Sequence, residues 1–184
     1  MQVLVLIDWQ TGFRDLDYWG NRNNPDALEN ARRLLAGWRG RGWPVIHVRH
    51  DSEMPQSRLH PDHPGNGFEE FALPQADEPV YAKNVNSAFI GTTLEADLRM
   101  RGMTHLVLCG ISTDHCVNTT ARMAGNLGFD VTLAADACYA FDRKAQDGTV
   151  IPAQTVHDVH LASLKGEFAK IRNVDDILMA VQCD

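Results

Sequence analysis

Apolar and polar residues occur along the chain in blocks whose lengths fit strands followed by helices. Val3 to Ile7 is an unbroken apolar run, which is typical of a central strand buried on both faces of a parallel sheet. Five further apolar runs of strand length follow, over residues 45–48, 80–82, 105–109, 131–134 and 168–171. This succession predicts an α/β fold in which six mainly parallel strands form the centre of a three-layer α/β/α, Rossmann-like sandwich.

Helical spacing of apolar residues fills the intervals between these strands. Asn24 and Pro25 are predicted to cap and begin a helix that ends at residues 40–42. The segment Thr92-Thr-Leu-Glu95 fits a capping box that opens a helix ending near Gly102. Further helices are expected over residues 113–127, 149–164 and 174–181.

One long segment, residues 51–75, has no such pattern and is rich in Pro, His, Gly and Ser. Long ordered loops in compact domains are often functional, so we expect this one to cross the surface and shape a binding site. No repeat or linker divides the sequence. We therefore expect one domain over residues 1–184, within the usual size of about 100–200 residues.

Composition limits the classes of molecule that we expect the protein to bind. The 17 basic and 24 acidic side chains give a formal net charge of −7, which argues against nucleic acid or an anionic membrane as the partner. Hydrophobic residues at 44% and charged residues at 22% are ordinary for a globular protein and argue against disorder. A small-molecule substrate is the partner that we expect.

The termini and cysteines predict a cellular setting. The first residues carry no basic region before their apolar run, and no run approaches the roughly 20 apolar residues of a membrane-spanning helix. Four cysteines, at positions 109, 116, 138 and 183, are irregularly spaced. We therefore expect a cytoplasmic protein whose cysteines are thiols.

Three chemically capable residues follow strands of the predicted sheet. Asp8 comes directly after the first strand, Lys83 after the third, and Cys116 follows the fourth across a short turn. Ligands of open α/β sheets bind outside the carboxyl ends of the strands, so these side chains are candidates for one site.

Cys116 is expected in the first turn of its helix, where free amides and the helix dipole favour a thiolate. A carboxylate such as Asp8 would exchange the proton of the thiol, and Lys83 would stabilise a negative charge. The backbone amides of Ser112 and Cys116 would form an oxyanion hole in the same turn.

Ordinary structural roles compete with these assignments. Cysteine is among the most buried residue types, and Cys109 lies within an apolar run, which favours a core position. Cys138 follows the fifth strand and is a second candidate nucleophile, whereas Cys183 near the end of the chain is interpreted as incidental. Asp8 alone fits a turn or cap, and Lys83 alone fits a solvated surface.

Several segments together resemble one known family. Asp8-Trp9-Gln10-x-x-Phe13, Lys83, Ser87-Ala88-Phe89 and Gly110-Ile-Ser-Thr-Asp-His-Cys-Val117 occur in this order. They are similar to the isochorismatase-like cysteine hydrolase superfamily, which includes nicotinamidases, carbamoylsarcosine amidases and streptothricin hydrolases. The likeness continues through Thr120-Ala-Arg122, Asp136-Ala137, Phe141-Asp142, His157, Leu161-Ala162 and Glu167-Phe-Ala169, so it covers nearly the whole chain.

The resemblance implies an isochorismatase-like fold and assigns roles to the candidates. Asp8 matches the general base and acid of the family, Lys83 the third member of its triad, and Cys116 its nucleophile. A cis peptide bond is implied between Ile111 and Ser112. The implied reaction is hydrolysis of a small amide through a thioester.

Three further residues match positions at the family's pocket. Phe13 and Phe89 are candidates to wall a planar substrate, although both equally fit the core. Gln10 is a candidate for binding the substrate or orienting the site.

Six potential metal ligands lie between positions 47 and 63: His47, His50, Asp51, His60, Asp62 and His63. Nicotinamidases carry an Asp-x-His metal motif after the second strand, but this sequence reads Arg49-His50-Asp51 there. We therefore expect no metal and no other cofactor, and we expect residues 58–65 to shape or cover the pocket or to form part of a subunit interface.

Two other functions are also compatible with the sequence. One is hydrolysis of the vinyl ether of isochorismate with Asp8 as the acid, which requires no thiol. The other is a binding protein on a hydrolase scaffold, since a fold does not determine a function. In either case the resemblance implies a homodimer or homotetramer.

Overall fold

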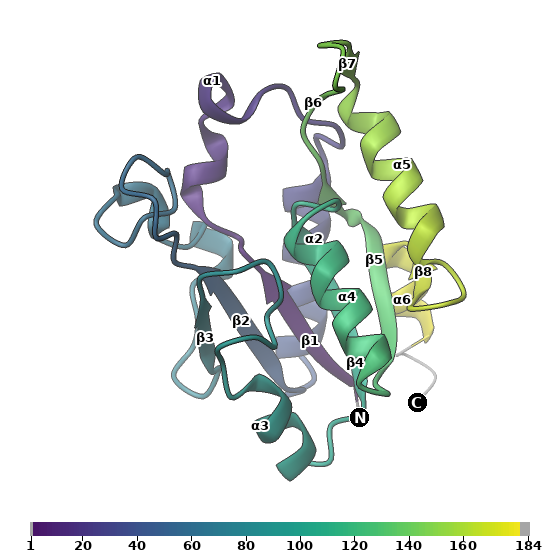
Figure 1. Cartoon of the computed structure of the whole chain (residues 1–184). Helices are drawn as coiled ribbons and strands as arrows, with labels where there is room; N and C mark the ends of the chain where they lie inside the picture. The colour runs from purple at the N-terminus through teal and green to yellow at the C-terminus, as the bar shows by residue number, and fades with distance from the viewer. Residues whose placement is uncertain (1, 181–184) are drawn as a thin grey trace.

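A parallel sheet organises the fold in the computed structural model, which describes residues 2–180 (Figure 1). Its strands lie in the order β3-β2-β1-β4-β5-β8, and each neighbouring pair is parallel. They are β1 (Gln2–Ile7), β2 (Val45–His50), β3 (Val80–Lys83), β4 (His105–Ile111), β5 (Asp130–Tyr139) and β8 (Lys170–Arg172). The predicted six-stranded α/β fold is confirmed.

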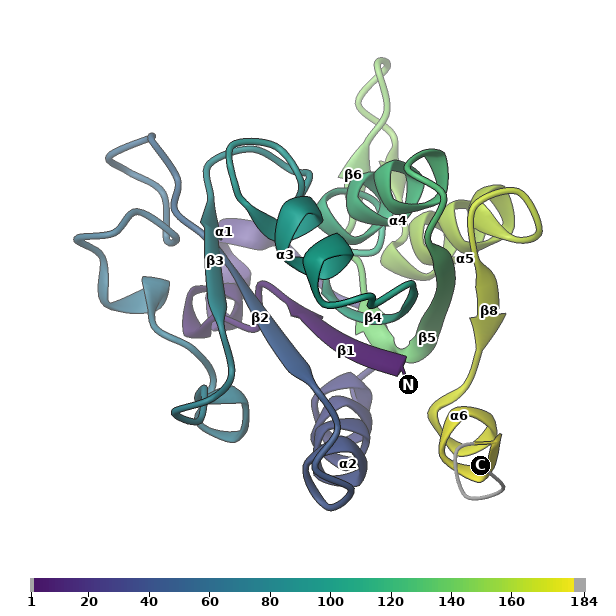
Figure 2. The same ribbon diagram turned by 90° about the horizontal axis from the view of Figure 1, so that it is seen from below.

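Helices cover both faces of this sheet (Figure 2). One face carries α2 (Ala27–Arg39) and α6 (Val174–Ala180), and the other carries α3 (Leu94–Met100), α4 (Cys116–Asn126) and α5 (Ala153–Leu164). The short helix α1 (Leu16–Trp19) lies in the connection after β1, and single 3-10 turns occur at Thr11–Arg14, Pro64–Asn66 and Glu70–Ala72. The three-layer arrangement is as the sequence predicts.

Burial follows the hydrophobic pattern. Val3 to Ile7 is at most 1% exposed, because β1 is flanked by β2 and β4 and covered on both faces. Helix α4 buries Val117, Ala121 and Ala124 completely, and these small side chains let the helix lie close to the sheet. The core therefore supports β1 and β4, whose carboxyl ends carry the candidate residues.

The predicted start of α2 is wrong. Asp26, and not Asn24, occupies the N-cap position. Asn24 has a left-handed backbone with φ of 48°, and its amide nitrogen donates to the carbonyl oxygens of Asp136 and Cys138 at 2.9 and 2.7 Å. Its side chain thus fastens the connection after β1 to β5, a tertiary role that the local sequence pattern did not reveal.

The predicted capping box of α3 is also wrong. The N-cap residue is Thr93, whose side chain makes no capping hydrogen bond. The hydroxyl of Thr92 donates to the carbonyl of Ala88 at 2.6 Å and accepts a longer bond, of 3.3 Å, from the Leu94 amide, whereas Glu95 pairs with Arg99 one turn along the helix. The two reciprocal bonds of a capping box are therefore not found among the described residues, and α3 begins one residue later than the box predicts.

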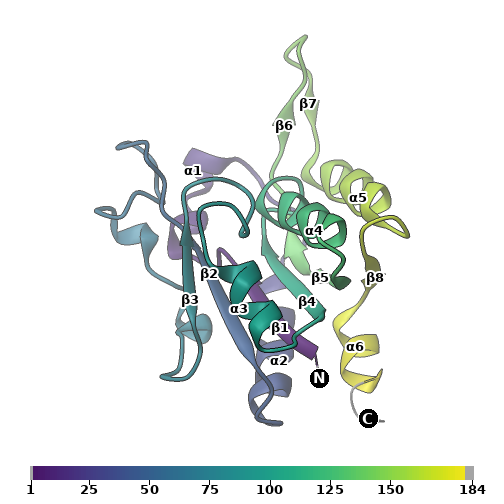
Figure 3. The same ribbon diagram turned by 60° about the horizontal axis from the view of Figure 1, so that its bottom comes forward.

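A hairpin missed by the sequence analysis follows β5. Strands β6 (Arg143–Lys144) and β7 (Val150–Ile151) are antiparallel and extend beyond the carboxyl edge of the main sheet (Figure 3). Because β7 occupies part of the predicted 149–164 helix, α5 begins only after Pro152. Similarly, α4 begins three residues later than predicted. Position 181 of the last predicted helix lies outside the described residues.

The segment between β2 and β3 crosses the surface, as expected, with two single 3-10 turns as its only helical parts. No helix found within residues 2–180 combines the length and the apolar character needed to cross a bilayer.

Gly110 allows β1 and β4 to approach closely beside the candidate site. It pairs with Ile7 and has φ of 151°. A Cβ atom at this position would lie 2.1 Å from the carbonyl oxygen of Ile7, which is backbone that cannot move aside. The close approach therefore requires glycine.

We expect Gly110→Ala to lower the free energy of unfolding by about 3 kcal/mol or more, because strain and overpacking add. Gly128→Ala is the matched control. Gly128 also has positive φ, 85°, but a Cβ there meets nothing within 4 Å, so strain of about 1–2 kcal/mol is the expected cost. Urea denaturation measures both, and equal losses in the two variants would contradict the argument.

Candidate active site

The structure brings together the three residues predicted at the ends of strands. Asp8 directly follows β1, Lys83 is the last residue of β3, and Cys116 is the first residue of α4. The ammonium Nζ of Lys83 donates to Asp8 Oδ2 at 2.7 Å and to Cys116 Sγ at 3.2 Å. A carboxylate, an ammonium and a thiol therefore form one connected cluster at the carboxyl edge of the sheet.

His50 is a fourth member of the cluster, considered from the sequence only as a metal ligand. It pairs in register with Lys83 on the neighbouring strand, and its Nδ1 lies 3.1 Å from Lys83 Nζ. An ammonium has only protons to offer, so Nδ1 is the acceptor and the imidazole is neutral. Burial and the nearby Lys83 charge lower the pKa of His50, which agrees with the neutral form. All three ammonium protons of Lys83 thus have acceptors.

The ion pair is fully enclosed, with Asp8 0% and Lys83 2% exposed. Burial alone would lower the pKa of Lys83, but the Asp8 charge and the hydrogen bonds to Asp8 and Cys116 outweigh burial and raise it. Lys83 therefore stays charged. The second carboxylate oxygen of Asp8, Oδ1, is buried and has no hydrogen-bond partner among the described residues.

The resting form of Cys116 differs from the sequence expectation. Burial and the Asp8 charge raise the pKa of the thiol, and they outweigh the opposing effect of Lys83. The position at the start of α4, expected to favour a thiolate, is too buried for that effect to prevail. Cys116 is consequently a neutral thiol at rest, and it requires a base to become a nucleophile.

The turn before Cys116 leaves several backbone amides available. The peptide bond between Ile111 and Ser112 is cis, and the Thr113 amide donates to the carbonyl of Tyr139 at 2.9 Å. The amides of Ser112, Asp114 and Cys116, by contrast, have no acceptor within residues 2–180. The predicted pair, Ser112 and Cys116, is therefore among the free donors of the turn that carries the thiol.

A pocket of about 250 Å³ opens onto the cluster. His50, Ser112 and Cys116 line part of it. Aromatic side chains contribute another part of the lining: Phe13, Tyr18, Trp19 and Phe141. Phe13 both lines the pocket and packs in the core, with its ring centroid 4.8 Å from that of Trp19. A small molecule with an apolar or flat portion fits such a lining.

The structure places two predicted pocket residues elsewhere. Gln10 is completely buried and does not line the pocket. Its Nε2 donates to the carbonyls of His50 and Asn66 at 3.0 and 2.9 Å, and its Oε1 accepts from the His50 amide at 2.8 Å. Phe89 packs against Phe129, with ring centroids 5.8 Å apart, and also lies outside the pocket lining. Gln10 therefore positions His50, and Phe89 is a partly buried residue that packs against the core.

The six residues weighed as metal ligands do not form one site. His47 bonds to Glu78 at 2.8 Å, Asp51 pairs with Arg49, and His63 Nδ1 accepts from the Gly65 amide. Within residues 2–180, the donor atoms that do converge are those of Asp8, His50 and Cys116, within 4.8 Å of one another. The ammonium of Lys83 bonds to all three, so these donors already surround a cation.

The other described cysteines lie apart from the pocket. Cys109 and Cys138 are free thiols with no exposed surface, and burial raises the pKa of both, that of Cys109 to about 12. Cys109 thus has the predicted core position, and Cys138 has no access to a substrate. Cys183 lies outside the described residues.

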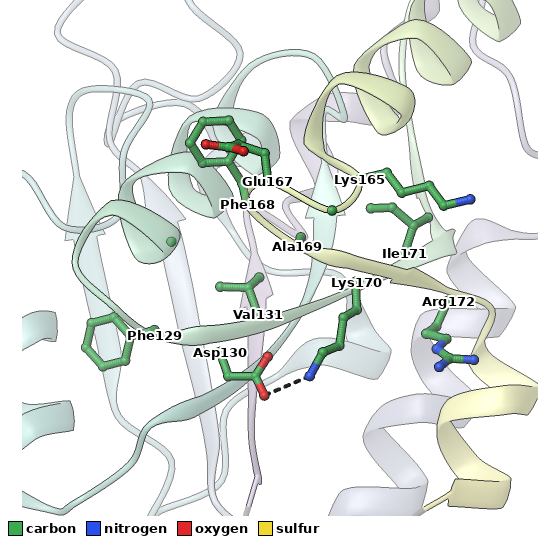
Figure 4. A pocket seen from close by; sticks show the side chains of 12 residues that line it. Phe129, Asp130, Val131, Lys165, Glu167, Phe168, Ala169, Lys170, Ile171 and Arg172 are labelled. Atoms are coloured by element: carbon green, nitrogen blue, oxygen red, sulfur yellow. Dashed lines mark hydrogen bonds and ion pairs between the residues drawn. The ribbon is translucent and has the colours of Figure 1, made fainter.

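A larger hollow, of about 560 Å³, lies between β5 and β8 at the far edge of the sheet (Figure 4). None of the predicted catalytic residues lines it, and the Lys170 ammonium within it bonds to Asp130 at 2.9 Å. The chemically capable side chains lie instead at the smaller pocket, so volume does not identify the site.

Comparison with known proteins gives a consistent result. The family model described as the isochorismatase domain matches residues 2–175. The isochorismatase family protein YrdC of Bacillus subtilis is 43% identical, over 96% of this chain and 94% of its own. A crystal structure of an isochorismatase-family protein from Chromobacterium violaceum is 46% identical with a TM-score of 0.95, and covers 100% of this chain and 94% of its own. Streptothricin hydrolase of Streptomyces noursei is 34% identical over 77% of this chain and 51% of its own.

The buried ion pair makes a prediction about stability. Lys83→Met leaves the Asp8 carboxylate buried without its partner, so we expect the free energy of unfolding to fall by about 3–5 kcal/mol. The double variant Asp8→Asn/Lys83→Met has no uncompensated charge and should recover most of that loss. Urea denaturation of the three proteins measures the effect. A Lys83→Met variant as stable as the wild type would show that the charge is not buried as described.

Proposed function

The chain belongs to the isochorismatase family of hydrolases, and from that premise we propose that it cleaves the C–N bond of a small amide through a thioester on Cys116. The observation that carries this proposal is the thiol in the pocket, bonded to an ammonium that is itself paired with a buried carboxylate. A nucleophile, a proton acceptor and a fixed positive charge are the parts that acyl transfer requires.

Asp8 acts as the base in the first step. Its carboxylate lies within 4.8 Å of Cys116 Sγ, and the thiol is protonated at rest. As sulfur forms a bond to the amide carbon, the thiol proton passes to Asp8 and the carbonyl π electrons move onto oxygen. The tetrahedral intermediate then collapses: the C–N bond breaks, and the departing nitrogen takes the proton from Asp8. An amine or ammonia leaves, and a thioester remains.

The free amides of Ser112 and Cys116 stabilise the oxyanion of this intermediate. Both belong to the turn that carries the nucleophile and have no competing acceptor in the described part of the chain. Backbone donors held by a rigid turn require no reorganisation when the charge develops, which makes them effective stabilisers of the transition state.

The second half of the reaction uses the same groups with water. As the oxygen of a water molecule attacks the thioester, Asp8 accepts a proton from that water. The C–S bond then breaks, and the sulfur regains the proton that Asp8 received. The net change is amide plus water to carboxylic acid plus amine. Lys83 remains charged throughout and stabilises the sulfur while it is negative.

The pocket limits the substrate to a small molecule. Its volume of about 250 Å³ is slightly below the usual range of roughly 300–1,000 Å³ for ligand sites. A peptide or polymer would not fit within such a hollow.

Release of ammonia or amine from a panel of small amides, ureides and carbamoyl compounds tests the proposal. We expect Cys116→Ala to lower turnover by about 10⁴-fold or more, as loss of a nucleophile does in other hydrolases. Cys138→Ala is the matched control, because it removes a buried thiol outside the pocket and should retain activity.

Isochorismate belongs in the same panel. Acid catalysis by Asp8 on its vinyl ether would proceed equally in the wild type and in Cys116→Ala. That result, together with no turnover of any amide, would contradict the thioester mechanism. Equal amide turnover by Cys116→Ala and the wild type would contradict it as well.

A further inference from the structure

The charge lining the pocket is unlike that of the protein as a whole. Although the chain has a net charge of −7, the described residues that line the pocket include one arginine, Arg143, and no carboxylate. The two histidines of the lining, His50 and His115, both have pKa values lowered chiefly by burial. Arg143 is therefore the one fixed charge presented to a ligand there.

We infer that Arg143 determines specificity by binding a carboxylate of the substrate, so that the pocket takes a small amide bearing an acidic group. This inference rests on the proposed function, since it names the class of amide on which Cys116 would act. A guanidinium donates two parallel hydrogen bonds to a carboxylate, and it stays positively charged because its pKa is far above neutral pH.

Contacts with Asp114 and His115 hold the Arg143 side chain in place. Its Nε donates to Asp114 Oδ2 at 2.6 Å, and its Nη2 lies 3.4 Å from His115 Nδ1. The Asp114 side chain is only 4% exposed, whereas that of Arg143 is 29% exposed. Burial would raise the pKa of Asp114, but hydrogen bonds from Arg143 and Ser112 lower it overall, so the anchor is ionised.

This anchoring leaves part of the guanidinium for a ligand. Nη1 has no hydrogen-bond partner among the described residues, and the Nη2 contact with His115 is long for a hydrogen bond. A guanidinium with one edge fixed by a buried carboxylate and the remainder facing a pocket is pre-organised, because its side-chain entropy is lost before the ligand binds.

The same anchor connects Arg143 to the reacting group. The Ser112 hydroxyl donates to Asp114 Oδ1 at 2.7 Å, so one carboxylate holds both Arg143 and the turn with the free amides. The position of a bound carboxylate is thereby fixed relative to Cys116. In a hollow of about 250 Å³, a carboxylate at Arg143 places the amide carbon of a small substrate only a few bonds away.

The aromatic lining suits the middle of such a substrate. Trp19 and Phe141 stack with ring centroids 5.7 Å apart, and Phe13 packs against both. These rings provide an apolar surface in the pocket that Arg143 and Cys116 also line. An acid with a short apolar or planar linker to its amide therefore matches the chemistry of this lining.

Alkylation of Cys116 tests the inference without a known substrate. Iodoacetate and iodoacetamide alkylate the same thiol. They differ in that iodoacetate carries a negative carboxylate and iodoacetamide a neutral amide. The ratio of their rate constants at Cys116, divided by that ratio for N-acetylcysteine, cancels the reactivity of the thiol itself. We expect this normalised ratio to exceed one in the wild type and to fall about tenfold in Arg143→Gln.

Lys144→Gln is the matched control for charge. Lys144 is the neighbouring residue of β6, is exposed, and does not line the pocket. It should retain the wild-type ratio. A ratio unchanged in Arg143→Gln would overturn the inference, because a purely structural arginine alters both rates together. An equal fall in both variants would overturn it too, by showing a general effect of net charge.

Substrate kinetics separate this inference from the proposed function. For succinamate, we expect Arg143→Gln to raise KM by about 30-fold while kcat changes little. The methyl ester of succinamate lacks the carboxylate, so we expect Arg143→Gln to leave the hydrolysis of its amide bond unchanged. Equal preference of the wild type for the acid and its ester would overturn the inference while leaving amide hydrolysis intact. Absence of all amide turnover, with the alkylation ratio as expected, would instead reject the proposed function and retain the anion site.

Discussion

The site depends on one buried ammonium that has three acceptors. Lys83 bonds to a carboxylate, an imidazole and a thiol that arrive on three other elements of the fold. An enclosed ion pair is costly unless hydrogen bonds compensate for lost water; here the ammonium is saturated, and Asp8 Oδ1 is the one atom of the pair without a partner among the described residues. The same ammonium keeps the base close to the nucleophile. A contact that stabilises the fold is thus also the contact that organises the chemistry.

The parallel sheet makes that contact possible. The carboxyl ends of β1, β2 and β3 meet at one edge, so Asp8, His50 and Lys83 come together without any long loop. Gly110 lets β4 approach β1 at the same edge. Gln10 then fixes the backbone of His50 through two hydrogen bonds. Each side chain of the cluster is therefore supported by backbone whose position the core determines.

The sequence was a good guide to features set by local pattern and a poor one to features set by distant contacts. Strand periodicity and positions after strands were sufficient for the six strands and for the grouping of Asp8, Lys83 and Cys116. The cap predicted at Asn24 failed because its amide bonds to β5, far along the chain. Likewise, nothing local distinguishes His50 from a metal ligand. Only its register with Lys83 shows the ammonium as its partner.

The protonation of the thiol shows the same limit. The start of a helix favours a thiolate by a local argument, whereas burial of Cys116 is a property of the whole fold and prevails. The consequence is mechanistic, because a neutral thiol requires the carboxylate of Asp8 as its base. The aromatic lining of the pocket is also assembled from distant parts of the chain, from Phe13 to Phe141.

Partitioning of the acyl group between water and hydroxylamine tests the central claim most directly. Two amides with the same acyl group but different leaving amines would pass through one thioester on Cys116. The account predicts that both give the same ratio of hydroxamate to acid at a given hydroxylamine concentration. A ratio that changes with the leaving amine, or turnover that gives no hydroxamate at all, would contradict a common acyl-enzyme and with it the role of Cys116.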